Sequence, residues 1–285
     1  TCCLLPLSAV ANEDPAIVPV TDNLHRLVST KGGNVLVSTG ADGVFLVDDQ
    51  LTPRSDIIKN AVKSLSDKDI SFIVNKHYHF DHTGGNEAFG EDGAIMVAHD
   101  NVRKRLNSKQ FITYFNREMA PLSKAGLPVV TFAHDVTFHY NDNSIHIIHA
   151  PNAHTDGDAF AHFSEANVIA TGDLAFNGMY PFVDVEHGGS FKGVIDAVDA
   201  MIAIADENTI IVPGHGPLMS LEELKAYRTV LSTVLEHVET AIKDGKSKEE
   251  IIAESPTQEF DAQMSKGIVS PDAFVELMYQ GLQPQ

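Results

Sequence analysis

Apolar and polar positions follow two patterns along the chain. Short apolar runs predict strands, and apolar positions at helical spacing predict helices. Short apolar runs bounded by Gly, Asp and Asn predict strands at 24–28, 34–38, 43–47, 70–74, 94–98, 127–132, 136–140, 144–149, 159–163, 167–170 and 209–212. Apolar positions three and four apart predict helices at 53–65, 191–204 and 221–242, with final helices at 247–254 and 270–281. The pattern alone therefore predicts a mixed α/β chain.

One stretch has a less regular pattern. Residues 100–106 and 108–125 are predicted to be helical with loops, and the second range holds an aromatic and methionine stripe made of Phe111, Tyr114, Phe115 and Met119. Such a stripe at helical spacing is more typical of a core than of a binding wall. We expect it to pack inside the protein, with a wall that faces substrate as the alternative.

Composition and charge narrow the function classes. The chain has 285 residues, 43% of them hydrophobic, which suits one large globular domain or at most two. Its 39 acidic against 20 basic residues give a net charge of −19. Such a surface repels nucleic-acid phosphates and anionic membranes. No run outside the N-terminus reaches the ~18 apolar residues of a membrane helix, so we expect a small-molecule substrate and no integral membrane segment.

The first residues resemble a targeting segment. Thr1–Ala11 is apolar and uncharged and ends in Ala9-Val10-Ala11, which predicts the end of a signal peptide whose basic start is missing. A disordered apolar terminus is the alternative. We therefore expect a domain over residues 12–285 and a periplasmic or secreted location. Cys2 and Cys3 both lie in the leader, so the mature chain has no disulfide, and a lipid-anchored cysteine stays open.

The clearest chemical signal follows the predicted strand 70–74. Three histidines and one aspartate fall within six residues, His77, His79, Asp81 and His82, and Thr83-Gly84-Gly85 then turns into a short helix. A strand fixes the backbone, and the loop at its end can turn polar side chains toward one point. Imidazole nitrogen and carboxylate oxygen suit zinc and neighbouring first-row metals. We predict a metal site here rather than a polar surface loop.

The string His-x-His-x-Asp-His at 77–82 resembles the signature of the metallo-β-lactamase superfamily of hydrolases. Three later strings resemble the family's other ligand segments in the same order, namely 152–158 with His154, 171–173 with Asp173, and 213–216 with His215. The resemblance covers about residues 35–217. It implies a four-layer αββα sandwich of two mixed β-sheets with helices on the outer faces, followed by C-terminal helices from about residue 221.

The resemblance also implies a set of site residues. One metal would be held by His77, His79 and His154, a second by Asp81, His82 and His215, and Asp173 would bridge the two. The implied cofactor is two Zn²⁺, with iron or manganese open. A metal-bridging hydroxide would open a cyclic amide or ester bond, and Asp81 would be catalytic by holding the water and relaying its proton.

Two further residues come from the same resemblance. Asp48 follows a predicted strand, where an aspartate of the family supports the metal ligands, although a turn-initiating Asp is equally typical of such a position. His187 lies in the loop 184–190 between Asp173 and the next helix, where we expect it near the site and in contact with substrate.

The substrate class is less constrained than the metal site. The full ligand set is closer to thioesterases of the glyoxalase II type and to lactonases than to familiar zinc β-lactamases, which usually lack the bridging aspartate. Yet Phe176 stands where lactonases commonly carry a tyrosine, and the basic residues that grip glutathione are not evident. An exported location fits β-lactam hydrolysis, and with it antibiotic resistance.

We therefore expect a β-lactamase-like dinuclear zinc hydrolase, with a thioesterase or a lactonase as the alternative. Two alternatives come from other classes, a mononuclear iron sulfur-dioxygenase and a non-catalytic accessory protein.

Overall fold

The computed structural model describes residues 15–28 and 32–283. The predicted signal-peptide remnant, residues 1–11, and both cysteines lie outside the described residues. The chain divides into two compact units. Unit 1 comprises residues up to 148 together with 161–166, and unit 2 comprises 149–160 and 167–285. The expectation of one domain over residues 12–285 stays a prediction.

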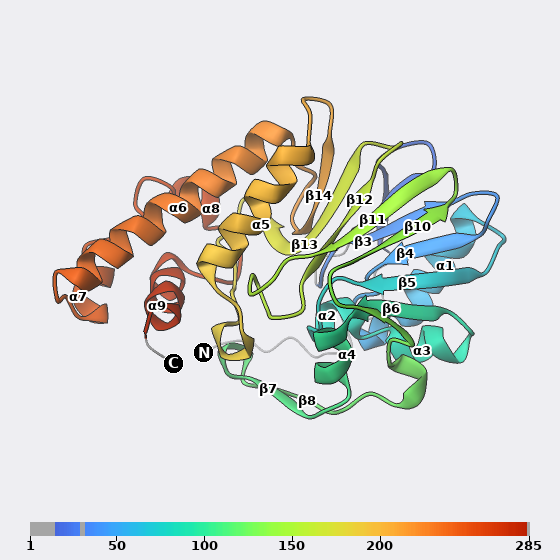
Figure 1. Ribbon diagram of the computed structural model, residues 1–285, viewed down its shortest axis with the longest axis horizontal. Coiled ribbons are helices and arrows are strands. Elements are labelled where there is room, and N and C mark those ends of the chain that lie inside the picture. The colour runs from blue at the N-terminus through green and yellow to red at the C-terminus, as the bar shows by residue number, and fades with distance from the viewer. Residues whose placement is uncertain (1–14, 29–31, 284–285) are drawn as a thin grey trace. The chain divides into compact units, whose positions relative to one another are not determined.

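A mixed sheet forms the centre of unit 1. Among the described residues, seven strands pair in the order β1-β2-β3-β4-β5-β6-β9 (Figure 1). Their bounds are Ala16–Pro19, Leu24–Val28, Val35–Thr39, Val44–Val47, Ile70–Asn75, Ile95–His99 and Val130–Phe132. The pairs from β1 to β4 are antiparallel, whereas β4, β5, β6 and β9 run parallel. The residues that follow β4 and β5 therefore meet at one edge of the sheet.

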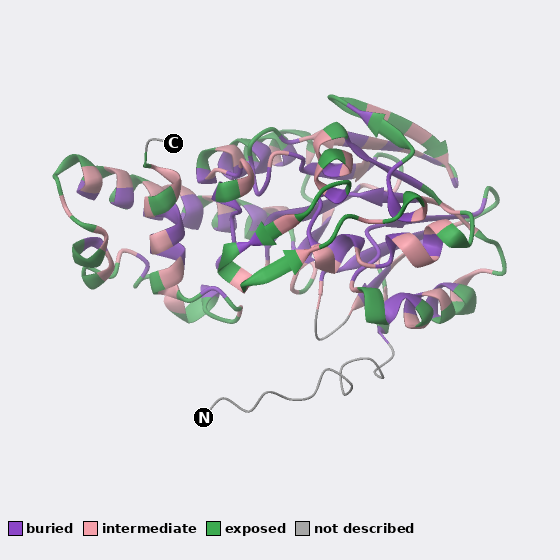
Figure 2. Cartoon of the chain, turned by 90° about the horizontal axis from the view of Figure 1, so that it is seen from below, coloured by how far each residue is buried: buried purple, intermediate pink, exposed green. Residues whose placement is uncertain are grey.

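Alternating side chains give this sheet two covered faces. Leu46 and Ile73 pack in one apolar cluster with Ile58 of helix α1 (Ser55–Leu65). Phe45 points the other way and meets Phe138 with ring centroids 5.0 Å apart. The middle strands are therefore buried along their length (Figure 2), which is why they consist of continuous apolar runs.

Phe138 lies on a hairpin that begins the second group of strands. Strands β10 (Asp135–Tyr140) and β11 (Asn143–His149) pair antiparallel. Asn141 and Asp142 between them have φ of 51° and 57°, the left-handed backbone that a tight hairpin turn requires. The turn joins the two strands predicted at 136–140 and 144–149. Strand β12 (Ala159–Phe163) lies at the boundary between the units.

Short helices of unit 1 lie beside the ends of its parallel strands. Helices α2 (Phe80–Thr83), α3 (Asn86–Glu91) and α4 (Asp100–Leu106) follow β5 and β6. The predicted helix from residue 53 is divided, because Pro53 lies in the 3-10 turn η2 (Thr52–Arg54) and α1 begins at Ser55.

The helical prediction for residues 108–125 is wrong. The segment forms a hairpin of β7 (Gln110–Ile112) and β8 (Arg117–Met119), joined by the 3-10 turn η3 (Thr113–Phe115) and followed by η4 (Lys124–Gly126). Asn116, with φ of 47°, supplies the left-handed turn residue. The expected core stripe divides accordingly, because Phe111 and Tyr114 are exposed while Met119 packs against the buried apolar cluster that contains Leu106.

Unit 2 pairs two parallel strands with long helices. Strands β13 (Val168–Phe176) and β14 (Ile210–His215) run side by side. Helix α6 (Leu221–Lys243) contacts both strands, and helix α5 (Phe191–Ile204) contacts β13 and α6 (Figure 1). Ser190 and Ser220 cap these two helices, as Ser side chains at both positions predict.

The remaining helical elements of unit 2 are η5 (Val185–His187), α7 (Lys248–Ala253), α8 (Asp261–Met264) and α9 (Pro271–Gly281). Sheets and helices together confirm the predicted α/β class and are consistent with the expected sandwich. Within the described residues, no helix is both long and apolar enough to pass through a bilayer.

Candidate metal centre

Unit 1 brings four predicted ligands together. His77 and His79 follow β5, while Asp81 and His82 lie in α2. The ring of His77 lies with its centroid 4.8 Å from that of His79 and 4.2 Å from that of His82. Asp81 Oδ2 lies 3.7 Å from His82 Nε2. We call these residues the unit 1 ligand cluster. All three imidazoles are almost fully buried, which restrains their rings before any ion binds.

Asp48 lies in hydrogen-bond contact with one of these rings, and its support of a metal ligand stays a prediction. It follows β4 directly and has φ of 63°. Its Oδ2 lies 2.6 Å from His82 Nδ1, and its Oδ1 accepts the backbone N–H of Lys76 at 2.9 Å. Because His82 Nδ1–H donates to a carboxylate, the lone pair of the neutral ring is on Nε2. This is the tautomer that a metal-binding histidine needs.

Two residues behind His82 were not recognised from the sequence. Lys76 is 1% exposed, and its Nζ lies 3.2 Å from Asp48 Oδ2. Gly33 lies so close to the imidazole that a Cβ there would meet His82 Cε1 at 2.2 Å. The sequence signals were weak, because a lysine after a strand is ordinarily solvated and the Gly32-Gly33 pair predicts only a turn.

Unit 2 brings together the other three predicted ligands. His154 Nε2 and His215 Nε2 lie 3.6 Å and 3.5 Å from the same atom, Asp173 Oδ2. His154 Nδ1–H donates to the carbonyl oxygen of Phe182 at 2.8 Å. Since a carbonyl can only accept, the lone pair of neutral His154 is on Nε2, toward Asp173. We call His154, Asp173 and His215 the unit 2 ligand cluster.

The strands of unit 2 extend further than the sequence predicts. β13 continues past residue 170 through Asp173 to Phe176, and its pairing with β14 shifts register on both sides of Gly172. Gly214 makes room for the ligand, because a Cβ at that position would meet Asp173 Oδ1 at 2.0 Å. Asp173 is therefore held in an irregular part of a strand, where bulges commonly redirect a side chain toward a site.

Asp158 supports the turn that carries His154. Its Oδ2 accepts the N–H of Thr155 at 2.5 Å, and its Oδ1 accepts the hydroxyl of Thr155 at 2.9 Å. Burial raises the pKa of Asp158 to about 8, although hydrogen bonds from Thr155 lower it, and the charge of Asp173 adds to the rise. The Thr-x-x-Asp spacing was the available signal for this role.

The predicted His187 lies next to the same turn. Its Nδ1 is 2.8 Å from Asp184 Oδ1, and the N–H of Asp184 donates to the backbone oxygen of His154. The loop is therefore near the unit 2 ligand cluster, as expected, while contact of His187 with substrate stays a prediction.

Phe176 stacks on His215, with centroids 5.2 Å apart and planes 6° apart.

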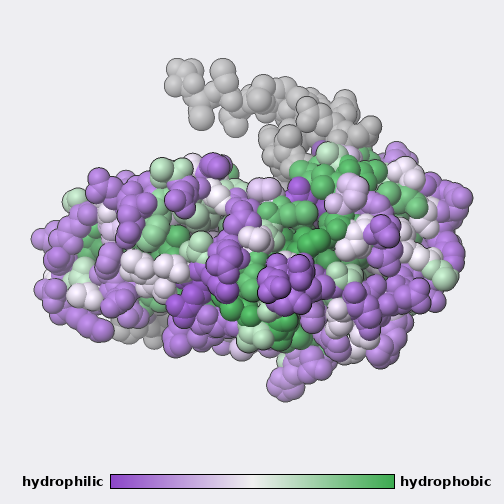
Figure 3. Space-filling model, turned by 90° about the horizontal axis from the view of Figure 1, so that it is seen from above, coloured by the Kyte–Doolittle hydropathy of each residue, from purple (hydrophilic) through white to green (hydrophobic). Residues whose placement is uncertain are grey.

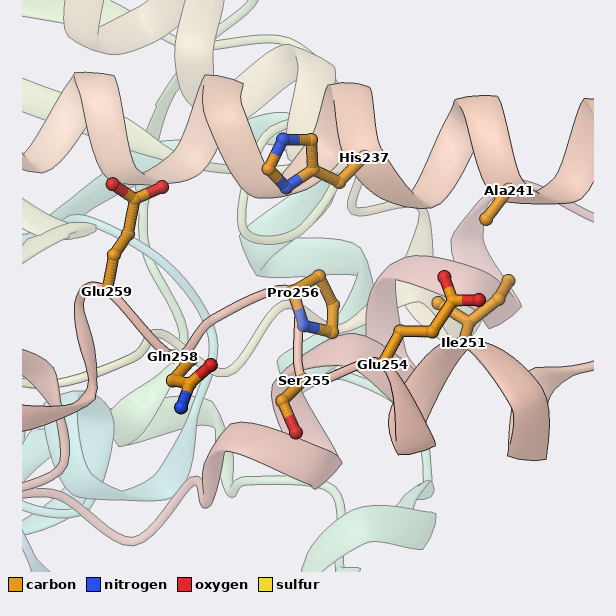
Figure 4. A pocket seen from close by; sticks show the side chains of 8 residues that line it. All are labelled: His237, Ala241, Ile251, Glu254, Ser255, Pro256, Gln258 and Glu259. Carbon is orange, nitrogen blue, oxygen red and sulfur yellow. The ribbon is translucent and has the colours of Figure 1, made fainter.

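A surface hollow elsewhere in unit 2 is unrelated to these clusters. It lies between α6 and the segment that follows α7 (Figure 4). Its lining residues are His237, Ala241, Ile251, Glu254, Ser255, Pro256, Gln258 and Glu259. None of the predicted ligands lines it, so we do not place the chemistry there.

The molecular face in Figure 3 is largely hydrophilic with apolar residues between, in keeping with the charged composition.

Comparison with known proteins relates the sequence to one family. Residues 27–215 match the family described as the metallo-beta-lactamase superfamily. An N-acyl homoserine lactonase of Bacillus thuringiensis is 36% identical over 101 residues, which is 30% of this chain and 40% of the relative. A second, from Bacillus sp., is 36% identical over 78 residues, 22% of this chain and 31% of the relative. The chain thus spans less than half the length of these curated relatives.

Solved structures extend the likeness over more of the chain. The stereoselective inverting sec-alkylsulfatase Pisa1 from Pseudomonas sp. has a TM-score of 0.71 at 14% identity, covering 94% of this chain and 50% of that one. A metallo-beta-lactamase from Pontibacter korlensis has a TM-score of 0.60 at 18% identity, covering 76% and 99%. At such identities the likeness shows a shared fold and nothing of the substrate.

Proposed function

The chain belongs to the metallo-beta-lactamase superfamily, and from this premise we propose that it is a β-lactamase-like metallohydrolase that opens a cyclic amide or ester bond. One observation carries the proposal. In unit 2, two buried or half-buried histidines turn their Nε2 atoms to a single carboxylate oxygen, Asp173 Oδ2. Together with a second His/Asp group in unit 1, this is a donor set for first-row metals rather than a set for nucleophilic catalysis.

We propose that the two ligand clusters serve one dinuclear centre. All seven side chains offer a nitrogen or oxygen atom that can bind a metal. In this proposal His77, His79 and His154 would hold one ion, Asp81, His82 and His215 would hold the other, and Asp173 would be shared between them. Their mixture of imidazole and carboxylate suits two Zn²⁺, and iron or manganese are alternatives that the same donors accept.

The protein's own residues prepare this chemistry. Divalent ions at the centre would polarise the bond under attack and lower the pKa of a bound water. Asp48 and the carbonyl of Phe182 hold His82 and His154 in the tautomer that binds metal. The Asp81 side chain, which keeps 17% of its surface exposed, is the proposed proton carrier.

A lactone is the second candidate substrate, because the curated relatives are N-acyl homoserine lactonases. We rank the cyclic amide before the lactone, because Phe176, beside His215, has no hydroxyl where lactonases commonly carry a tyrosine. A thioester is the third candidate. We also propose that the protein is exported, on the pattern of residues 1–11 alone.

The test is a substrate panel run on zinc-loaded protein. It compares benzylpenicillin, N-hexanoyl homoserine lactone and S-lactoylglutathione, with metal content measured on the same preparation. We expect about two zinc ions per chain and turnover of benzylpenicillin, with the lactone second. No turnover of any of the three would contradict the hydrolase. One iron per chain with oxygen consumption would identify the sulfur-dioxygenase instead.

A further inference from the structure

The hairpin β7–β8 of unit 1 carries an arginine toward the ligand cluster. Arg117 pairs with Ile112 across the hairpin, so both side chains lie on the same face of the two strands. Ile112 is 1% exposed, and that face is therefore the one turned toward the body of unit 1. The neighbouring pair, Phe111 and Glu118, lies on the opposite face, and both residues are exposed, as Arg117 is.

Arg117 rests on a residue inside the metal motif. Its guanidinium carbon lies 3.6 Å from the centroid of the Phe80 ring, and the Phe115 ring lies edge-on to Phe80, with centroids 6.0 Å apart and planes at 89°. Phe80 stands between His79 and Asp81 in the chain. A guanidinium carbon this close to a ring centroid makes a cation–π contact, which does not consume the N–H donors of the arginine.

Beyond its contact with the Phe80 ring, the charge of Arg117 has a long-range interaction with Asp81 and no salt bridge within the described residues. Partial burial lowers the pKa of Arg117 and the carboxylate of Asp81 raises it, so the two charges interact while the arginine stays protonated at neutral pH. Within the described part of the chain, its guanidinium makes no hydrogen bond or ion pair. Arg103, Arg105 and Arg228, by contrast, each donate a hydrogen bond.

We propose that Arg117 binds the carboxylate of the substrate and so selects anionic over neutral substrates. A planar guanidinium with a free edge matches a carboxylate in two-point contact. In a protein of net charge −19, an unpaired cation beside a metal ligand also draws an anion toward the site. This deepens the proposed function and rests on it, because a substrate carboxylate is what distinguishes a β-lactam from a neutral acyl lactone.

The kinetic test compares two substrates that have the same β-lactam bond and differ in whether they carry a carboxylate. Benzylpenicillin carries a carboxylate, and its methyl ester does not. For Arg117→Met we expect kcat/KM for benzylpenicillin to fall roughly 10- to 100-fold, mainly through KM, as loss of a charge-assisted pair predicts. The methyl ester should change little, which also shows that the hairpin keeps its place. For Arg117→Lys we expect kcat/KM for benzylpenicillin to lie between the wild-type and Arg117→Met values, because lysine keeps the charge and loses the two-point contact of the guanidinium.

Lys109→Met is the matched control, because Lys109 is an exposed cation near the same hairpin that already pairs with Glu118 at 2.6 Å. It should leave both substrates unchanged. Equal losses for the acid and the ester in Arg117→Met, or no loss for the acid, would overturn the role of Arg117 while leaving the hydrolase proposal intact.

A binding measurement separates the two proposals if turnover is absent. Benzoate and benzamide are titrated into metal-loaded wild type and Arg117→Met by calorimetry, and the Nε–H signal of Arg117 is followed by NMR. We expect benzoate to move that signal and to bind at least about fivefold more weakly to the variant, with benzamide unaffected. That result without turnover would refute the hydrolase and keep the anion site. Equal benzoate affinity in both proteins would refute the anion site.

Discussion

In unit 1, Asp48 Oδ2 lies 2.6 Å from His82 Nδ1 and 3.2 Å from Lys76 Nζ. One buried carboxylate thus orients a predicted metal ligand and neutralises a buried ammonium. The two tasks have different energetic consequences, because orientation affects metal affinity whereas neutralisation affects the stability of the fold.

We expect Asp48→Asn to lower both the stability of the fold and the affinity for metal. Lys76 would be left buried without a counter-charge, which costs roughly 3–5 kcal/mol of unfolding free energy. Metal affinity should fall about 10- to 100-fold, because His82 loses its charged partner. Chemical denaturation of the metal-free protein and competition with a chelator measure the two effects.

The double variant Asp48→Asn, Lys76→Met separates them. Removing the stranded ammonium should restore much of the stability while metal affinity stays low. If affinity returned together with stability, Asp48 would be a structural partner of Lys76 and no support for the ligand.

Gly214→Ala tests the packing behind the unit 2 ligand cluster. A Cβ would meet Asp173 Oδ1 at 2.0 Å and the backbone carbonyl of Gly172 at 2.7 Å, so the carboxylate and the strand next to it must both shift. We expect metal affinity to fall at least about tenfold with the circular dichroism spectrum unchanged. Unaltered affinity would mean that Asp173 can shift without consequence and does not bind metal through this geometry.

Asp173→Ala removes the proposed bridge. We expect the variant to fold, to lose one of its two ions and to lose most turnover, because the two metals would no longer share a ligand. Elemental analysis and kinetics measure this, with the exposed Asp196→Ala on α5 as control. Full metal content in Asp173→Ala would show that the bridge is assigned to the wrong residue.

A stability prediction concerns the contact between α5 and α6. Asp199 accepts two hydrogen bonds from Arg228 at 2.8 Å, and these bonds lower the pKa of Asp199. A depressed folded pKa stabilises the fold above the unfolded value of about 3.9, and this stability is lost as the pH falls through the folded value.

Asp199→Asn should therefore cost under about 1 kcal/mol, since the pair is partly exposed and screened. The difference from wild type should be equal at pH 7 and pH 5 and shrink below about pH 4. Denaturation at several pH values and at high salt measures it. A difference that grew on acidification would contradict the assigned direction.

The sequence predicted the regular elements where the local pattern and the tertiary structure agree. Strand β2 and helix α5 have the predicted bounds, because continuous apolar runs and amphipathic spacing are local signals. The hairpin at 110–119 escaped prediction, since its strands are three residues long and alternation cannot be recognised over so few positions. Its turn depends on the left-handed Asn116.

The candidate ligands were predictable because their types and order form a specific string, whereas their supports were not. Lys76, which follows β5, pairs with Asp48, which follows the neighbouring strand β4, and Gly214 of β14 lies against the side chain of Asp173 on β13. Contacts of this kind depend on which strands become neighbours, and a single sequence does not specify that pairing locally.

The most direct test of the proposed centre is a crystal structure of the zinc-loaded protein with anomalous scattering measured at the zinc edge. The proposal predicts two peaks per chain, about 3.5–4 Å apart, one beside His77, His79 and His154 and the other beside Asp81, His82 and His215. Asp173 would touch both. A map without such peaks, or with Asp173 and His215 remote from them, would contradict the proposed function.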